Sequence, residues 1–372
     1  MTILNQKKTE TMIIFRRTIV LSIIALAGFV CAEAKTVVRD SKTGETLPKA
    51  SIFDNRGRFL GVASEDGVIP NIDASNYPLS IKFIGYENGE VASPSVETVA
   101  LESSSYELPE VNVSSSGRVL HLTAYARIYS TQTTSGDTIT EVSEKIIDFM
   151  IPKGKVKKVK ARLNPRILAS RSAYHFTNAE GLDSVSDKTE QHMFSNLIRI
   201  FDQRPVPTSF NKEGTKIDSV AGKYSTKEVW RKIGEKYYVE HDGLADYKNH
   251  NYSPWELKML GMTMTMKKAE TNYVVDNLSK TVQVDDLDRF SYEADFDLKG
   301  KWFKKALKAN DTVNSKTYGE VFIIDREYLS PEEAKELEKN PPVIESVEIK
   351  APAGIPAMHP ESLKLMERVH GN

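Results

Sequence analysis

The side chains best suited to bind a metal ion lie in a short polar segment between residues 240 and 255. His241, Asp242, Asp246 and His250 follow one another closely there, and imidazole nitrogens and carboxylate oxygens are common ligands of divalent metals. The spacing between the two histidines matches no established ligand motif, so a solvated loop is the preferred interpretation and no metal site is assigned. We keep the four residues as candidate metal ligands.

Three aromatic residues, Tyr247, Tyr252 and Trp255, lie in the same segment. Aromatic rings beside polar loops suit contact with a glycan or a protein, because they combine a large apolar area with a polar tip. Packing inside a core would explain them equally well. They are our candidate partner-binding residues.

No sequence motif points to a catalytic centre or a cofactor site. The chain has no phosphate-binding loop, no dinucleotide-binding glycine motif, no serine-hydrolase elbow and no His-Glu-x-x-His. Cys31 is the single cysteine, so paired-cysteine metal and redox sites are excluded. We therefore assign no catalytic residue and no cofactor. A catalytic triad leaves no local motif, and an enzyme stays an open alternative.

The composition is that of a folded, nearly neutral protein. The 372 residues carry 50 Lys and Arg against 51 Asp and Glu, and 40% of them are hydrophobic. A net charge of −1 argues against nucleic-acid binding, which needs a basic face. The length suggests two or three domains.

Residues 1–34 have the pattern of an export signal. Two arginines precede the apolar run 18–32, and a small-x-small cleavage site ends at Ala34. We expect cleavage after Ala34, which leaves no membrane span and places the protein in the periplasm, on the cell surface or outside the cell. Acylation of Cys31, as in a lipoprotein, is less favoured because Val30 rather than a small residue precedes it.

Residues 35–114 read as short strands separated by turns. β-Prone runs alternate with turn residues, and Gly67 offers a positive φ for one of the turns. Residues 79–84 place an apolar side chain at every second position, which predicts one face on a core and the other in water. The pattern predicts a small β-sandwich.

Several motifs follow one another in this segment: Val38-x-Asp40, Gly44-x-x-Leu47-Pro48, Ser64-x-Asp66-Gly67 and Gly85-Tyr86. In their order and spacing, residues 35–114 resemble the carboxypeptidase regulatory-like domain of Bacteroidetes cell-envelope proteins. The resemblance implies a transthyretin-like β-sandwich without catalytic residues, of a kind often found at the N-terminus of exported proteins.

A Ser- and Gly-rich run places a domain boundary near Gly117, and residues 118–330 predict an α+β domain built on β-hairpins. A long hairpin is expected over residues 120–152. Capping boxes predict helices beginning at Ser225 and Ser253, and an apolar stripe predicts another helix over residues 188–202. Further strands are expected over residues 272–275, 281–284, 290–298 and 316–325.

The C-terminal part, residues 331–372, is expected to hold a helix, a Pro-rich tail and a short helix over residues 360–369. A third capping box, which begins at Ser330, marks the start of the first helix. The expected fold class is mainly β, with an N-terminal transthyretin-like sandwich followed by the α+β domain.

The function that these features favour is that of an exported, non-enzymatic cell-envelope protein. It would bind a protein or polysaccharide partner through its second domain, by strand edges and aromatic loops. Two alternatives stay open. One is a hydrolase of peptide or glycan within residues 118–330, which converging carboxylates or a shared metal would favour. The other is an assembly subunit of an outer-membrane complex.

Overall fold

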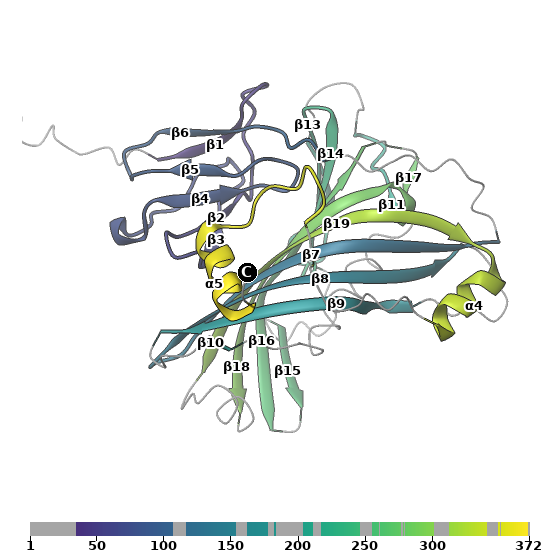
Figure 1. Ribbon diagram of the computed structural model, residues 1–372. Coiled ribbons are helices and arrows are strands. Elements are labelled where there is room, and N and C mark those ends of the chain that lie inside the picture. The colour runs from purple at the N-terminus through teal and green to yellow at the C-terminus, as the bar shows by residue number, and fades with distance from the viewer. Residues whose placement is uncertain are drawn as a thin grey trace, which may run out of the picture.

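Most of the described chain is β-strand, and the strands form two layers (Figure 1). The mainly β fold class is therefore confirmed. The structure is a computed structural model, and it describes residues 35–106, 117–153, 162–177, 182–183, 204–210, 217–245, 255–259, 261–276, 278, 280–300, 312–340, 349 and 351–370.

The N-terminal layer, residues 35–106, contains two small sheets. One is a parallel pair formed by β1 and β6. The other is a four-stranded sheet in the order β3-β2-β4-β5. The alternation over residues 79–84 corresponds to β4. The bounds of the strands are β1 (Val37–Asp40), β2 (Ser51–Phe53), β3 (Phe59–Val62), β4 (Leu79–Lys82), β5 (Gly89–Val91) and β6 (Thr98–Leu101), with the short 3-10 helix η1 (Ala74–Asn76) before β4.

Two details of this layer can be checked against the sequence. Gly67 has a φ of +72°, and a Cβ there would lie 2.9 Å from the Val38 carbonyl oxygen, so the turn requires glycine. The outward face of β4, in contrast, is not in water: Lys82 is only 1% exposed. That expectation was wrong because a second sheet packs against this face. The likeness to a transthyretin-like domain stays a prediction, as do the domain boundaries.

The second layer is one antiparallel sheet of eleven strands. Ten strands follow the order β10-β9-β8-β7-β19-β18-β16-β14-β13-β12, and β15 pairs with the first half of β16. Their bounds are β7 (Val119–Thr133), β8 (Thr138–Pro152), β9 (Arg162–Phe176), β10 (Leu182–Asp183), β12 (Asp218–Ala221), β13 (Thr226–Ile233), β14 (Lys236–Asp242), β15 (Trp255–Met259), β16 (Met262–Val275), β18 (Leu287–Gly300) and β19 (Val313–Leu329).

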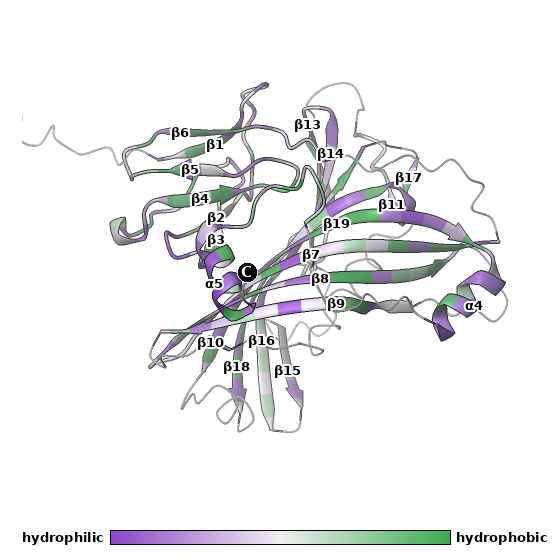
Figure 2. Cartoon of the chain, in the orientation of Figure 1, coloured by the Kyte–Doolittle hydropathy of each residue, from purple (hydrophilic) through white to green (hydrophobic). Residues whose placement is uncertain are grey.

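Consecutive residues of β7 belong to two different cores, because successive side chains of a strand point to opposite faces. Tyr125 packs with the N-terminal layer, whereas Ala124 and Ala126 belong to a separate cluster that contains no residue of that layer. We call the side that meets the N-terminal layer face A and the other side face B. Figure 2 shows the resulting mixture of hydrophobic and hydrophilic residues along β7, β8 and β19.

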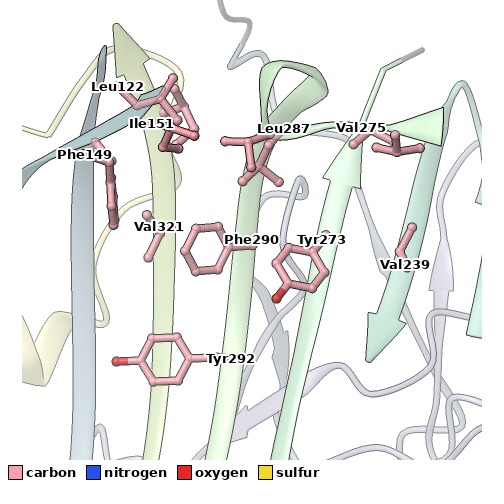
Figure 3. Close-up of a cluster of buried hydrophobic side chains, with 14 of the residues drawn as sticks. Leu122, Phe149, Ile151, Val239, Tyr273, Val275, Leu287, Phe290, Tyr292 and Val321 are labelled. Carbon is pink, nitrogen blue, oxygen red and sulfur yellow. The ribbon is translucent and has the colours of Figure 1, made fainter. Parts of the chain in front are cut away.

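Face B carries an apolar cluster that crosses seven strands, from β8 to β13. Figure 3 shows Phe290 and Tyr273 at its centre, on neighbouring strands. A second pair of short strands, β11 (Arg204–Pro205) and β17 (Thr281–Val282), and the 3-10 helix η2 (Val284–Asp286) supply further members such as Val282 and Val284.

Two helices follow the large sheet, and both were predicted. In α4 (Pro331–Lys339), Ser330 and Glu333 form the expected capping box, and Ala334 packs against Val119 and Met150 on face A. Neither α4 nor α5 (Pro360–His370) is long and apolar enough to cross a membrane, and the same holds for every helix among the described residues.

The helices expected to begin at Ser225 and Ser253 were wrong. Residues 226–233 form β13, and residues 255–259 form β15. In β13, Trp230 and Ile233 are buried, and Gly234 then turns the chain with a φ of +57° into the aromatic strand β14. Tertiary pairing thus outweighed a local motif that is also compatible with a strand. The predicted helix over residues 188–202 lies outside the described residues.

Candidate functional site

The predicted metal ligands do not converge within the described part of the chain. His241 and Asp242 are consecutive residues of β14, so their side chains point to opposite faces and do not share one ion. Asp246 and His250 lie outside the described residues. Where the structure describes the chain, no three His, Asp or Glu side chains gather in a way that could hold a metal ion.

The candidate partner-binding aromatics are largely outside the described chain as well. Tyr247 and Tyr252 are not described, and Trp255 is the first residue of β15, opposite Met266 of β16. A role for these residues in partner binding stays a prediction.

A cluster of carboxylates lies on face A, where the N-terminal layer meets the sheet. Glu270 of β16 stands directly opposite Glu293 of β18, a pairing of like charges that is unfavourable unless cations neutralise it. Lys268 Nζ lies 2.6 Å from Glu293, and Lys49 Nζ of the N-terminal layer lies 3.5 Å from Glu270 and 3.8 Å from Glu240. The cluster therefore joins the two layers electrostatically.

Lys49 reaches this cluster from an unusual backbone conformation. Its φ is +58°, and no other non-glycine residue in the described ranges has a positive φ. Such a conformation costs of order 1 kcal/mol and persists only where the surroundings enforce it. The ammonium group of Lys49 supplies a positive charge to Glu65, Glu240 and Glu270 at once.

The cavity beside the cluster is small. Its volume is about 30 Å³, and its lining includes Lys49, Glu240, Glu270 and Asn272, whose Oδ1 atom has no hydrogen-bond partner. Such a volume holds about two water molecules and excludes a sugar ring or a peptide. Among the described residues the carboxylates thus converge, as a hydrolase would require, but the cavity beside them is too small for such a substrate.

Burial raises the pKa of Glu240 to about 7, and the neighbouring carboxylates Glu65 and Glu270 add to the shift, whereas Lys49 and Arg231 oppose it. The folded protein therefore binds this proton more tightly than the unfolded chain does. Between pH 4.5 and about 7, the folded state must give up stability as the pH rises, and the loss is complete above that range.

We expect Glu240→Gln to remove this pH dependence. The amide resembles the protonated carboxyl, so the variant should match the wild type near pH 4.5 and exceed it by about 1–3 kcal/mol at pH 8. Urea unfolding across this pH range measures the difference. The exposed Glu332→Gln serves as the control. A difference between wild type and E240Q that does not change with pH would contradict the assignment.

Two larger cavities lie elsewhere. One, of about 820 Å³, is an open groove in the N-terminal layer lined by Ile69, Ile72 and Tyr77. The other, of about 400 Å³, adjoins β9 and is lined by charged residues of the sheet and by apolar residues of the C-terminal segment. The second lies beside Arg171 of the edge strand β9.

Four charged residues stand opposite one another across neighbouring strands of face A. Glu320 of β19 pairs with Arg127 of β7, Arg127 with Glu144 of β8, and Glu144 with Arg171 of β9. Arg171 Nε donates a hydrogen bond to Glu144 Oε2 at 2.6 Å, and Arg127 Nε lies 3.8 Å from Glu144 Oε1. We call this set the charge row. Sequence reasoning missed it, because its members are brought together only by the register.

The charge row ends at the outer edge of β9. Within the described ranges, β10 covers only Tyr174 and His175 of this edge. The Ser172 carbonyl oxygen accepts a hydrogen bond from His370 Nε2 of α5 at 2.9 Å, which shows that it points away from β8. From Arg171 back to the start of β9, no strand in the described part of the chain pairs with this edge.

Comparisons with known proteins do not identify the chain. No family model and no curated protein matches it. A solved structure described as lipid–protein interactions in lipovitellin aligns with a TM-score of 0.28 at 10% identity, over 57% of this chain and 26% of that one. The enduracididine biosynthesis enzyme MppR complexed with pyruvate aligns with a TM-score of 0.10 at 7% identity, over 61% of this chain and 93% of that one. Scores this low carry no argument about fold or function.

Proposed function

We propose that the protein is an exported, non-enzymatic binding protein of the cell envelope that holds a partner protein along the open edge of β9. The open edge is the observation that supports this proposal. A strand edge presents a row of backbone N–H and C=O groups, and an extended segment of another chain can pair with them.

The same observation favours a protein partner over a polysaccharide, because only a polypeptide backbone matches the ladder of hydrogen bonds. An assembly subunit of an outer-membrane complex would be one form of such a binding protein. Export rests on the expected leader in residues 1–34 and on the resemblance of residues 35–114, which both stay predictions.

Site-specific photo-crosslinking in cells tests the proposal. Leu168 is the extra residue of a bulge in β9, between the residues paired with Ile146 and Ile147. A photoreactive amino acid at Leu168 should give a protein adduct in the envelope fraction, on a chain shortened by the leader. The same probe at Lys42, exposed in the N-terminal layer, is the matched control. A Leu168 probe that yields no adduct beyond the Lys42 control, or a full-length chain in the cytosol, would overturn the proposal.

A further inference from the structure

We infer that the strand bound by β9 is acidic on the side facing face A, because the charge row ends on an arginine beyond which no strand pairs in the described part of the chain. The inference rests on the proposed function and adds the chemistry of the partner. In an antiparallel pair, residues directly opposite each other lie close enough to interact, and opposite charges stabilise the pair.

The charge row alternates in sign from one end to the other. Lys82 of the N-terminal layer lies 3.7 Å from Glu320, so the sequence of charges from Lys82 to Arg171 is plus, minus, plus, minus, plus. One positive charge is left over. The side chains of Arg127 and Glu144 are each 3% exposed, whereas that of Arg171 is 29% exposed. Arg171 is therefore the end of the row that an added strand can reach.

A second arginine lies on the same edge and the same face. Arg166 Nε donates to Asp148 Oδ1 at 3.1 Å, and Asp148, like Glu144, points to face A. Arg166 and Arg171 are five positions apart, which in a regular strand would place them on opposite faces. The extra residue Leu168, which lies between the partners of Ile146 and Ile147, shifts the alternation by one position and places both arginines on face A. Arg166 is already bound by Asp148 and, through Nη1, by the Leu337 carbonyl oxygen of α4 at 3.0 Å, so Arg171 is the arginine that an added strand meets.

The 400 Å³ cavity beside the edge supplies a place for an apolar side chain. It is lined by Arg171 together with Met358 and Leu363 of the C-terminal segment, and Leu363 is 43% exposed. In a strand added to β9, the side chains at every second position face this side. We therefore expect the partner to combine acidic and apolar residues at alternate positions of one face.

Peptide binding to the full mature chain, measured by fluorescence polarisation, tests the inference. The probes are three labelled eight-residue peptides in which one face alternates between valine and either glutamate, glutamine or lysine, and threonine occupies every position of the other face. The glutamate peptide should bind about fivefold more tightly than the glutamine peptide, and the lysine peptide most weakly. The preference should disappear in Arg171→Met and reverse in Arg171→Glu. Arg56→Met, at an exposed site in the N-terminal layer, should leave it unchanged.

The outcomes separate the inference from the proposed function. Equal binding of the three peptides to the wild type overturns the acidic preference and leaves strand pairing in place. A glutamate peptide N-methylated at every residue has no backbone N–H left to donate to a strand, so its undiminished binding would overturn edge pairing instead. Failure of every peptide to bind overturns the inference. The wild-type series requires no variant to fold, and thermal unfolding checks the Arg171 variants.

Discussion

Replacing Lys82 with methionine should lower the free energy of unfolding by about 3–5 kcal/mol. Lys82 is 1% exposed, and its Nζ atom lies 3.7 Å from Glu320 and 3.4 Å from the Tyr129 hydroxyl, over whose ring it stacks at 5.1 Å. Methionine keeps much of the volume and removes the charge. Glu320 would then be a buried carboxylate without the cation that links it to the N-terminal layer. Denaturant unfolding followed by circular dichroism measures the loss.

A double variant distinguishes the ion pair from simple packing. Lys82→Met combined with Glu320→Gln removes both charges, and it should recover most of the lost stability. The exposed Lys42→Met should change stability by less than about 0.5 kcal/mol. If Lys82→Met were no more harmful than Lys42→Met, the ion pair would not hold the layers together.

Replacing Phe290 with alanine should cost about 3–5 kcal/mol. Phe290 is fully buried on face B, and its ring centroid lies 5.8 Å from that of Tyr273 on the neighbouring strand. The cost combines the lost burial of the ring with the cavity left at the centre of a cluster that spans seven strands. Equilibrium unfolding in urea gives the value.

Two controls bracket this result. Phe290→Leu keeps most of the apolar volume and should cost less than half as much as the alanine variant. Ile217→Ala, at a side chain that is 64% exposed, should have almost no effect. A cost below about 1 kcal/mol for Phe290→Ala would mean that face B is not a packed core.

Local sequence patterns predicted much of the fold. The hairpin expected over residues 120–152 corresponds to β7 and β8, which pair along their full length, from Val119 opposite Pro152 to Thr133 opposite Thr138. The capping box at Ser330 marks the start of α4. Both features depend on residues that are close in sequence. The period of the apolar residues predicts the strands, and the chemistry of the capping residues predicts the start of the helix.

What the sequence could not predict depends on contacts between distant segments. The pairing of Arg127 with Glu320 joins residues far apart in the chain, and no local signal sets that register. Lys82 occupies an outward position of a strand, where lysine is normally solvated, and it is buried only because the large sheet covers it. The capping box at Ser225 failed for the same reason, since β13 is fixed by its pairing with β14.

The C-terminal segment touches both layers. The carbonyl of Pro356 accepts a hydrogen bond from Arg127 of the sheet, and that of Ala357 accepts one from Asn88 of the N-terminal layer at 2.7 Å. Met358 packs with Phe53 of the N-terminal layer and Tyr129 of the sheet. These residues follow every strand of both layers in the sequence. The ribosome therefore adds the segment that joins the layers only after both layers have been synthesised, and the interface between them cannot be completed before then.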